Sequence, residues 1–363
     1  MPETAAGRPC TIVLLPGDGV GPEVLAQGRR VLERVAAARG LELVFEEALV
    51  GGCAIDATGS SLPPETLALC EGADAVFLGA VGGPKWSDPS APVRPEQGLL
   101  QLREHFGLYA NLRPIPVFDG LVELAPVRPE LVRGVDILFV RELVSGIYFG
   151  PRQEQGDGDT AWDTLRYSVP EVERAARVAF AAARGRRRKL TSVDKANVLA
   201  SMRLWRRTVD AVAADYPDVT VEHLLVDAAA MHLIRSPGAF DVVLAGNMFG
   251  DILSDEASVL SGSLGMLPSA SLGDGSFGLY EPVHGSAPDI AGRGLANPIG
   301  AILSAAMLLR YSLGREAEAA AVEAAVAAAL ETGARTADLG PADGASASTE
   351  EMADAIVERL DLG

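Results

Sequence analysis

The sequence predicts an α/β protein with open sheets flanked by helices. One observation supports this fold class, and two more bear on the number of domains and on the kind of cofactor site. Strand-like segments at 11–15, 41–48 and 75–79 alternate with helical patterns, the first of which begins at Pro22 and runs to about Arg39. The chain of 363 residues is long enough for two domains that each have a core. No G-x-G-x-x-G motif follows the first strand, so an ordinary Rossmann cofactor site is not indicated.

The composition is typical of a globular protein, with 48% hydrophobic and 22% charged residues. The net charge of −18 disfavours nucleic acids and anionic membranes as partners. Three cysteines without a C-x-x-C pair predict neither a disulfide scaffold nor a zinc site. There is no signal-peptide pattern at the N-terminus and no uncharged stretch approaching the roughly 20 apolar residues of a membrane helix. We therefore expect a cytoplasmic protein.

Two aspartates, Asp251 and Asp255, stand four residues apart on a predicted helix. This spacing places both carboxylates on one face, where they repel each other unless a cation lies between them. Oxygen ligands alone favour a hard cation, Mg²⁺ or Mn²⁺, over zinc. The alternative is a solvated acidic face, or acids favoured by the dipole near a helix N-terminus.

Asp227 and Lys195 each follow a predicted strand, 219–226 and 190–194 respectively. The carboxyl ends of strands are where open α/β sheets bind their ligands. A lysine beside acids and a metal can have a tuned pKa and serve as a base. The alternative is that each is an ordinary surface residue capping the next helix.

Three arginines, Arg103, Arg113 and Arg141, stand in apolar or tightly turned surroundings. Arg141 ends a hydrophobic strand, where burying a guanidinium without an anion is costly. A substrate carboxylate can supply this anion through two parallel hydrogen bonds. The alternative for Arg141 is a structural pair with Glu142. Three arginines beside a metal site favour a di- or tricarboxylic substrate.

Several later segments carry structural signals. Aromatic residues among glycines and aspartates between 146 and 170 predict an exposed hairpin arm, and the alanine-rich stretch 316–330 predicts a helix. The stretch 340–346 is a turn-rich linker, after which Ser348 and Glu351 have the spacing of a capping box for a last helix.

Seven segments resemble the signature sequences of the isocitrate and isopropylmalate dehydrogenase family, a class of metal-dependent β-decarboxylating dehydrogenases. They occur in the family's order and extend over roughly residues 10–360. The segments are 15–23, 79–86, 111–114, 140–143, 146–150, 194–198 and 285–292.

The resemblance implies a two-domain isopropylmalate dehydrogenase-like fold. Residues 1–109 together with 262–363 would form a discontinuous cofactor-binding domain. Residues 110–261 would form a central domain with the metal site, the dimer interface and the hairpin arm. The family also implies a homodimer with shared active sites, in which Lys195 and Asp227 enter from the neighbouring subunit.

The implied reaction is the NAD-dependent oxidative decarboxylation of 3-isopropylmalate to 4-methyl-2-oxopentanoate and CO₂ in leucine biosynthesis. Lys195, with Asp227 nearby, is the expected base, and Tyr148 is the expected acid. Mg²⁺ or Mn²⁺ would be held by Asp227, Asp251 and Asp255, while Arg103, Arg113 and Arg141 would hold the carboxylates of a small dicarboxylate substrate.

By the same resemblance, the nicotinamide cofactor binds along one loop and near one asparagine. A carboxylate in that loop, Asp289, accepts hydrogen bonds from a ribose 2′-hydroxyl and repels a 2′-phosphate, which favours NAD over NADP. The expected cofactor residues are His284, Gly285, Ser286, Ala287, Pro288, Asp289, Ile290 and Asn297.

Substrate choice depends on the segment before Arg103, where Glu96, Leu99 and Leu100 are expected to meet the substrate side chain. The leucines suit an isopropyl group and offer nothing to a third carboxylate. The chain has Val144-Ser145 where the family usually has Thr-Gly, so a related 3-alkylmalate, tartrate or D-malate stays open as the substrate. A regulatory subunit with the same fold is the non-enzyme alternative.

Overall fold

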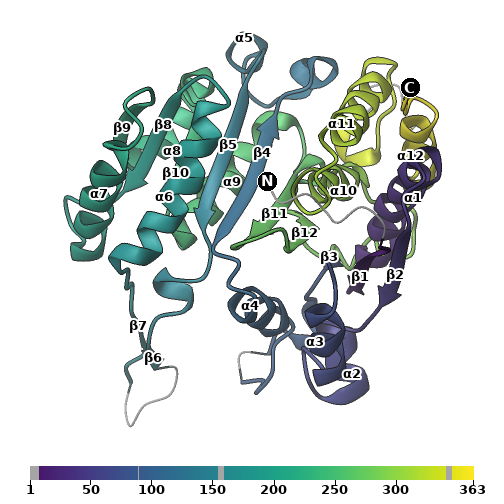
Figure 1. Cartoon of the computed structure of the whole chain (residues 1–363), viewed down its shortest axis with the longest axis horizontal. Coiled ribbons are helices and arrows are strands. Elements are labelled where there is room, and N and C mark those ends of the chain that lie inside the picture. Colours follow the sequence, from purple (N-terminus) through teal and green to yellow (C-terminus); the bar gives the residue numbers. More distant parts are fainter. Residues whose placement is uncertain (1–7, 89, 154–158, 341–345) are drawn as a thin grey trace.

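The computed structural model describes residues 8–88, 90–153, 159–340 and 346–363. In this part of the chain one open, mixed sheet of ten strands runs through the molecule, in the order β2-β1-β3-β12-β11-β4-β5-β10-β8-β9 (Figure 1). The predicted α/β fold class is confirmed. The strands are β1 (Cys10–Gly17), β2 (Leu43–Glu47), β3 (Ala75–Ala80), β4 (Ala110–Pro116), β5 (Asp136–Glu142), β8 (Lys189–Asp194), β9 (Thr220–Leu225), β10 (Val242–Ala245), β11 (Pro268–Leu272) and β12 (Gly278–Pro282).

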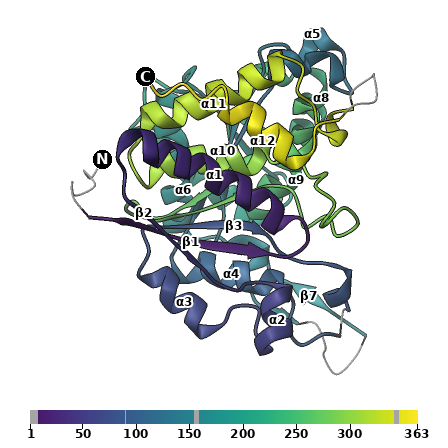
Figure 2. The same cartoon turned by 90° about the vertical axis from the view of Figure 1, so that its right-hand side faces the viewer.

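Helices lie on both faces of the sheet. Figure 2 shows α1, α10, α11 and α12 on one side of β1 and β3, and α2, α3 and α4 on the other. No described helix is both long and apolar enough to cross a membrane. The helices are α1 (Gly21–Arg39), α2 (Gly52–Thr58), α3 (Pro64–Glu71), α4 (Glu96–His105), α5 (Pro129–Val132), α6 (Val169–Arg184), α7 (Ala200–Ala213), α8 (Val226–Arg235), α9 (Asn247–Ser258), α10 (Ile299–Tyr311), α11 (Glu316–Glu331) and α12 (Thr349–Val357).

The sheet is parallel at its two ends and antiparallel in the middle. β2, β1, β3 and β12 run parallel, as do β5, β10, β8 and β9, whereas β12, β11, β4 and β5 pair in antiparallel fashion. Every residue of β3 and β10 is buried, as expected for parallel strands covered on both faces. The parallel group from β5 to β9 therefore presents its carboxyl ends along one edge.

The core includes a helix that is apolar all round. Residues 299–309 of α10 are all buried, and the helix packs against α1, α11, β11 and β12.

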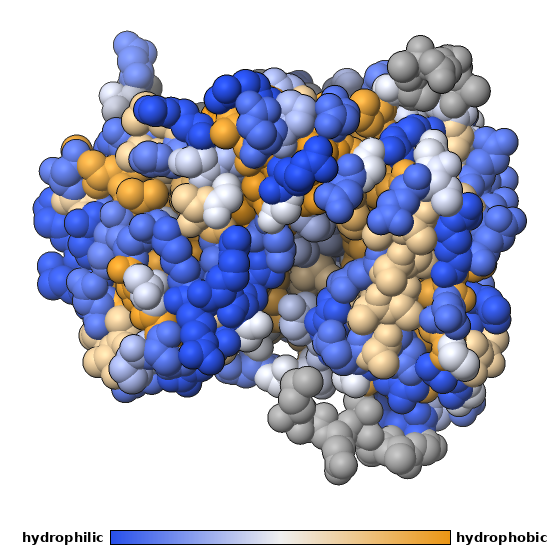
Figure 3. All heavy atoms as spheres, turned by 90° about the horizontal axis from the view of Figure 1, so that it is seen from above, coloured by the Kyte–Doolittle hydropathy of each residue, from blue (hydrophilic) through white to orange (hydrophobic). Residues whose placement is uncertain are grey.

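A cavity of about 660 Å³ lies between α6 and α10. It is at the N-terminal end of β5, whereas Arg141 is near the C-terminal end of that strand. Figure 3 shows the molecule hollowed between its two halves when viewed from above.

A buried carboxylate organises the loop after β1. Asp18 is 5% exposed and accepts backbone N–H hydrogen bonds from Gly52 (2.7 Å), Cys53 (2.8 Å) and Gly82 (2.8 Å). Two of these N–H groups belong to the first turn of α2, where they have no acceptor within the helix, and the third belongs to the turn that follows β3. The Asp18 carboxylate therefore connects the N-terminus of α2 to that turn. Within this loop, Gly19 has a φ of +59°, and an added Cβ would lie 1.9 Å from the carbonyl oxygen of Ser286. The loop therefore packs directly on the backbone of the 284–290 segment.

The local predictions agree with the structure where it can be described. The first three strands and the first helix match β1, β2, β3 and α1 within a few residues, and the alanine-rich stretch forms α11. The capping box opens α12: Ser348 Oγ accepts from the Glu351 N–H at 3.2 Å, and the Glu351 carboxylate accepts from the Ser348 N–H at 2.8 Å. Most of the predicted 340–346 linker lies outside the described residues.

The predicted arm contains a small hairpin that projects from the body of the molecule (Figure 1). Its strands are β6 (Arg152–Gln153) and β7 (Trp162–Asp163), which pair in antiparallel fashion, and residues 154–158 between them are outside the described part. The predicted domain boundary falls between β11 and β4, which are hydrogen-bonded neighbours in one sheet. The division into two domains stays a prediction.

We predict that Asp18→Ala lowers the free energy of unfolding by about 2–4 kcal/mol, because three backbone N–H groups lose a charged acceptor. Denaturant unfolding at a fixed protein concentration measures the change. Glu46→Ala, a truncation of an exposed acid on β2, is the matched control and should stay within about 0.5 kcal/mol of the unaltered protein. Equal stability of both variants would show that the Asp18 hydrogen bonds contribute nothing.

Candidate active site

Four of the side chains singled out in the sequence gather at the carboxyl end of β5 and on the helix after β10. Arg113 comes from β4, Arg141 from the end of β5, and Asp251 and Asp255 from α9. β4 runs antiparallel to β5, and Arg113 and Phe139 are paired residues of the two strands. The sheet thus brings residues from three separate segments to the edge where open α/β sheets bind ligands.

Arg141 is buried, with 2% of its side chain exposed, and its charge is compensated by α9. Its Nη1 lies 2.5 Å from Asp251 Oδ1, while Nε and Nη2 donate to Asn247 Oδ1 at 3.0 and 2.7 Å. Complete burial, reinforced by the charge of Arg113, lowers the pKa of Arg141 to about 9, so the guanidinium is still charged at neutral pH. The sequence analysis did not single out Asn247.

The alternative pairing of Arg141 with Glu142 does not occur. Adjacent side chains of a strand point to opposite faces of the sheet, and Glu142 lies on the other face. Its carboxylate accepts from the N–H groups of Val144 (3.2 Å) and Ser145 (3.1 Å), and Arg174 lies 3.7 Å away.

Arg113 lies between the two aspartates of α9. Its Nη1 is 3.1 Å from Asp255 Oδ1 and donates to Ser254 Oγ at 2.8 Å, and its Nη2 is 3.2 Å from Asp251 Oδ1. The four-residue spacing does place both acids on one face. In the described chain, the cations beside them are the guanidinium groups of Arg113 and Arg141.

The two aspartates have different proton affinities. Burial raises the pKa of Asp251, but the charges of Arg141 and Arg113 outweigh it, so the pKa lies below the ordinary value. Burial also raises the pKa of Asp255, and there Arg113 offsets it only in part, so the pKa stays above the ordinary value. Asp251 is therefore the more firmly ionised of the two.

Tyr148 joins this cluster through Asp251. Its hydroxyl donates to Asp251 Oδ2 at 2.9 Å, and the Arg141 guanidinium lies 5.6 Å from the centre of its ring. Burial and the charge of Asp251 raise the pKa of Tyr148, which keeps the phenol protonated and able to donate a proton. The turn that leads to it needs Gly146, with φ +75°, because an added Cβ would lie 2.4 Å from the hydroxyl of Tyr167.

Arg103 reaches the same region from α4. Its Nη2 lies 2.8 Å from Glu281 Oε1, a buried acid on β12 that the sequence analysis missed because nothing in a strand pattern distinguishes it. The charge of Arg103 contributes to the pKa shifts of Arg141 and Asp251. Its Nε is buried without a hydrogen-bond partner among the described residues, which leaves a donor for an anionic ligand.

Lys195 and Asp227 lie next to each other but apart from this cluster. Lys195 Nζ is 2.5 Å from Asp227 Oδ1, and this hydrogen bond lowers the pKa of Asp227. They follow β8 and β9, which β10 separates from β5. Within the described ranges, no group of three or more His, Cys, Asp or Glu residues is placed to hold a metal ion. One chain thus brings Asp251 and Asp255 together without Asp227.

The predicted cofactor segment borders a cavity of about 620 Å³. Five of the eight predicted residues line it: His284, Gly285, Ala287, Ile290 and Asn297. Of the other three, Ser286 is buried and accepts from the Val20 N–H at 2.8 Å, while Pro288 and Asp289 are exposed. Arg293 Nη1 donates to the Asp289 carbonyl oxygen at 3.4 Å, a cation that the sequence analysis did not place there.

Two features of this cavity fit a nucleotide. His284 Nε2 is buried without a partner in the described structure, and burial lowers the pKa of His284, so a neutral imidazole is available to a ligand. An added Cβ at Gly285 would meet nothing within 4 Å, so a ligand can approach the backbone there. Asp338, which the sequence analysis missed, also lines the cavity and accepts from Asn297 Nδ2 at 3.0 Å.

The predicted selectivity residues begin the helix that carries Arg103. Leu99 and Leu100 are half-buried and Glu96 is exposed. Leu99 and Arg103 are four residues apart on α4 and therefore share a face. Gly82 allows the close approach of Glu96, since an added Cβ would lie 2.8 Å from Glu96 Oε1.

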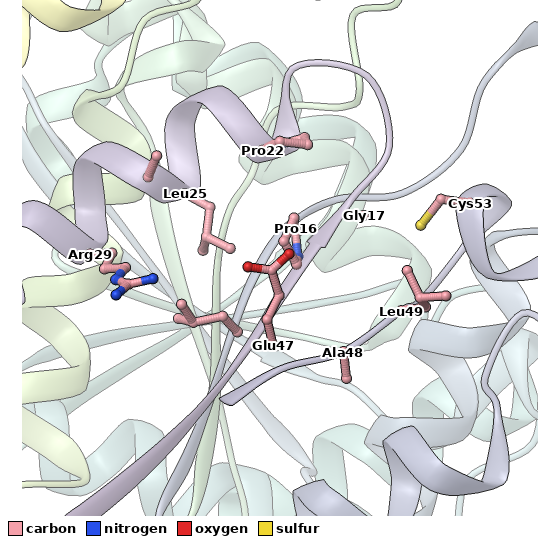
Figure 4. Close-up of a pocket in the computed structure, with 11 residues that line it drawn as sticks. Pro16, Gly17, Pro22, Leu25, Arg29, Glu47, Ala48, Leu49 and Cys53 are labelled. Atoms are coloured by element: carbon pink, nitrogen blue, oxygen red, sulfur yellow. The ribbon is translucent and has the colours of Figure 1, made fainter. Parts of the chain in front are cut away.

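A separate cavity of about 350 Å³ lies between α1 and the end of β2 (Figure 4). Its lining includes Pro22, Leu25, Arg29, Glu47 and Cys53. None of the predicted catalytic, metal or cofactor residues lines it, so the candidate active site is elsewhere.

Comparison with known proteins agrees with this constellation. A sequence profile described as isocitrate/isopropylmalate dehydrogenase matches residues 11–356. The chain belongs to this family. It is 59% identical over 352 residues to a 3-isopropylmalate dehydrogenase of Anaeromyxobacter dehalogenans (strain 2CP-C), covering 96% of this chain and 99% of that protein. It is also 59% identical over 348 residues to a 3-isopropylmalate dehydrogenase of Geobacillus kaustophilus (strain HTA426), covering 95% and 94%.

Solved structures give the same family. The fold matches that of an isocitrate dehydrogenase from Methylococcus capsulatus with a TM-score of 0.86 at 34% identity, covering 97% of this chain and 99% of that one. A β-decarboxylating dehydrogenase from Thermococcus kodakarensis, in its apo form, matches with a TM-score of 0.79 at 39% identity over 97% and 96% of the two chains. This dehydrogenase fold is therefore that of an oxidoreductase.

In this family member, the side chains of the unusual Val144-Ser145 pair make no hydrogen bond, within the described residues, to the arginines and aspartates of the cluster. The N–H groups of both residues bond to Glu142, on the face of β5 opposite Arg141. Burial raises the pKa of Glu142 from 4.5 to about 7, although the two N–H groups and Arg174 counteract it. The pair therefore adjoins a buried acid, and the Ser145 carbonyl oxygen accepts from Asn247 Nδ2 at 3.1 Å.

We predict that this buried acid makes the dehydrogenase less stable as the pH rises. A carboxyl with a raised folded-state pKa contributes stability that is fully present below its unfolded pKa and is lost as the pH rises through its folded pKa. A rise from 4.5 to about 7 corresponds to about 2.5 kcal/mol lost between pH 5 and pH 8. Glu142→Gln should remove this part of the pH dependence, as measured by denaturant unfolding at both pH values.

The matched control for Glu142→Gln is Glu33→Gln, which alters an acid with 46% of its side chain exposed and should leave the pH dependence unchanged. If the unfolding free energies of Glu142→Gln and the unaltered protein changed in parallel from pH 5 to pH 8, Glu142 would not titrate in that range.

Proposed function

We propose that this protein catalyses the NAD-dependent oxidative decarboxylation of 3-isopropylmalate to 4-methyl-2-oxopentanoate and CO₂, a step of leucine biosynthesis. The observation that carries the proposal is the cluster of Arg113, Arg141, Asp251 and Tyr148, with a third arginine on the helix that bears Leu99 and Leu100. Relatives with 54–59% identity that are named 3-isopropylmalate dehydrogenase support the same substrate.

The arginines are suited to hold the two carboxylates of a malate. Arg141 and Arg113 are at most 7% exposed, so an anion bound to them is shielded from water, and both present several N–H donors. Arg103 has a buried Nε donor without a partner in the described chain. When substrate carboxylates take over these guanidinium groups, Asp251 and Asp255 lose their cationic partners and can serve as ligands of a cation.

We propose that this cation is Mg²⁺ or Mn²⁺. The donor set of Asp251 and Asp255, completed by Asp227 of the partner subunit, consists of oxygens only, as a hard cation prefers. When bound, the ion polarises the C2 oxygen of the substrate and stabilises negative charge there. The low pKa of Asp251 keeps a ligand ionised at neutral pH.

The proton transfers are assigned to two residues. Lys195, whose Nζ lies 2.5 Å from Asp227 Oδ1, would take the C2 hydroxyl proton in its neutral amine form, directly or through water. The cofactor NAD⁺ would supply the acceptor for the hydride that leaves C2. The resulting β-keto acid loses CO₂, and Tyr148 donates its hydroxyl proton to the carbon that carried the carboxylate. Burial and Asp251 raise the pKa of Tyr148, so it is protonated when this step occurs.

The cofactor would lie in the cavity lined by His284 and Asn297. The neutral imidazole of His284 offers an unpartnered nitrogen to it, and the exposed carboxylate of Asp289 is available to a ribose 2′-hydroxyl. We therefore propose NAD, with the cofactor site formed by the 284–290 segment and Asn297.

We also propose a homodimer with shared active sites. Helices α8 and α9 pack side by side and expose large apolar side chains, among them Met231 (59% exposed) and Ile252 (58%). Val198, close to Lys195 in the sequence, is 63% exposed. Exposed apolar side chains of this kind support a contact with a partner. A second copy seated there would bring its own Lys195 and Asp227 towards Asp251 and Asp255. The cytoplasmic location stays a prediction.

Steady-state kinetics across 3-isopropylmalate, malate, tartrate and isocitrate, with NAD⁺ and NADP⁺, tests the reaction. We expect the highest kcat/KM for 3-isopropylmalate with NAD⁺, and no turnover in excess chelator. Leu99→Ala should narrow the preference for 3-isopropylmalate over malate by about 10-fold or more, because an apolar contact is lost. A higher kcat/KM for tartrate, malate or isocitrate would reject the proposed substrate, and the absence of NADH formation with any of them would favour a regulatory subunit.

The shared site predicts complementation between two inactive variants, Lys195→Ala and Asp251→Asn. In a mixed dimer, one site carries both lesions and the other is intact. Random reassociation of equal amounts makes half of the dimers mixed, so roughly a quarter of the unaltered activity should return after joint unfolding and refolding. Each variant refolded with itself is the control. If mixed dimers form, as shown by mass spectrometry, and stay inactive, each site is built within one chain.

A further inference from the structure

Asn247, the first residue of α9, has every polar group of its side chain engaged. It is 1% exposed. Its Oδ1 accepts from Arg141 Nε and Nη2, and its Nδ2 donates to the carbonyl oxygens of Leu143 (2.8 Å) and Ser145 (3.1 Å). Its backbone N–H donates to the hydroxyl of Tyr167 at 2.8 Å. A single carboxamide therefore joins β5, the turn after it and the start of α9.

The contact with Arg141 determines which donors of the guanidinium stay available. A guanidinium has five N–H groups arranged along two edges that can each bind a carboxylate with two hydrogen bonds. Asn247 occupies the edge formed by Nε and Nη2. The edge formed by Nη1 and Nη2 is left for an anion, and in the described structure Nη1 faces Asp251 there. Asn247 thus orients the group so that one edge points to the ligand side.

The contacts with Leu143 and Ser145 fix the turn that carries Tyr148. From the other side, the Glu142 carboxylate accepts the N–H groups of Val144 and Ser145. The turn is therefore held through its carbonyl oxygens by Asn247 and through its N–H groups by Glu142. One helical turn after Asn247, α9 presents Asp251, which accepts the hydrogen bond from Tyr148.

We propose that Asn247 is a positioning residue that sets the orientation of Arg141 and Tyr148 relative to each other. Its carbonyl oxygen aligns the arginine that holds a substrate carboxylate, and its amide group aligns the tyrosine that donates the proton. The inference rests on the proposed function. It assigns the two halves of one side chain to different kinetic effects, the oxygen to substrate affinity and the amide to turnover.

The first variant is Asn247→Ala, in which water can enter the space and satisfy the freed carbonyl oxygens. Both alignments are lost, and a displacement of about 1 Å at a reacting group can cost 100-fold. We expect KM for the 2-hydroxy acid to rise about 10-fold or more and kcat to fall by at least as much. KM for the nicotinamide cofactor should stay within about two-fold of its original value, because Asn247 is outside the 284–290 segment.

The second variant, Asn247→Asp, separates the two effects and keeps the volume of the side chain. Its carboxylate still accepts from Arg141, but it has no N–H to donate and repels the carbonyl oxygens of Leu143 and Ser145. We expect KM for the 2-hydroxy acid to lie closer to that of the unaltered protein than in Asn247→Ala, with kcat reduced in both. This variant also serves if Asn247→Ala does not fold.

Thr208→Val is the matched control. It removes a buried hydroxyl that donates to the Leu204 carbonyl oxygen at 3.0 Å within α7, and it should lower only the unfolding temperature. The proposal is overturned if Asn247→Ala behaves like this control, with a lower unfolding temperature but KM and kcat within two-fold of the unaltered protein. Equal KM values for the Ala and Asp variants would overturn the assignment of the carbonyl oxygen to substrate affinity.

All variants are assayed with the 2-hydroxy acid that the unaltered protein oxidises best. If that substrate is not 3-isopropylmalate, the proposed function fails while the inference about Asn247 is still tested by the ratio of variant to unaltered protein. If 3-isopropylmalate is oxidised but the variants keep KM and kcat, the inference alone fails.

Discussion

The burial of the Arg141 charge at the end of β5 is the constraint on which the site depends. A guanidinium with 2% of its surface exposed must be compensated by anions and hydrogen-bond acceptors, and α9 supplies both through Asp251 and Asn247. This requirement fixes α9 against β5. The packing is close enough that an added Cβ at Gly250 would lie 2.9 Å from Arg141 Cβ. The position of Tyr148 follows, because its hydroxyl bonds to the same aspartate.

The same arginines and aspartates that pair with each other in the described chain would bind the substrate and the cation in the proposed complex. In the chain alone, Arg113 and Arg141 neutralise Asp251 and Asp255. A dianionic substrate and a divalent cation bring equal and opposite charge, so each can replace one partner of these pairs without leaving a buried charge alone. Under the proposed function, binding either one alone would leave Arg141 or Asp251 uncompensated, which is unfavourable for the buried guanidinium and the partly buried carboxylate, whereas Asp255 has 53% of its side chain exposed. Joint binding of substrate and metal would then be favoured.

The sheet also explains why one chain holds only part of the proposed site. β10 lies between β5, which carries Arg141, and β8, which precedes Lys195. Asp227 lies in the first turn of α8, which follows the edge strand β9, and 63% of its side chain is exposed. Asp227, the proposed third metal ligand, thus faces outward on α8, the helix whose exposed apolar side chains we assign with those of α9 to a dimer contact, and the proposed base Lys195 beside it is 27% exposed. Formation of the site and burial of that surface would then be one event.

The sequence by itself determined those features of the protein that depend on local rules of helix and strand formation. Alternating patterns gave the α/β fold class, the spacing of Ser348 and Glu351 gave the start of α12, and the spacing of Asp251 and Asp255 placed both on one helix face. These conclusions depend on residues within a few positions of one another, where helix and strand periodicity fixes the direction of each side chain. Resemblance to a family then proposed roles for residues that local rules could not connect.

Only the tertiary structure decided which partners the buried groups choose. Arg141 pairs with Asp251, 110 positions along the chain, and not with its neighbour Glu142, because adjacent strand residues face opposite sides of the sheet. Asn247, Glu281 and Asp338 carry no motif of their own, since an amide or acid becomes informative only when long-range packing buries it beside a charge. Sequence periodicity encodes which way a side chain points, whereas the fold determines what it meets there.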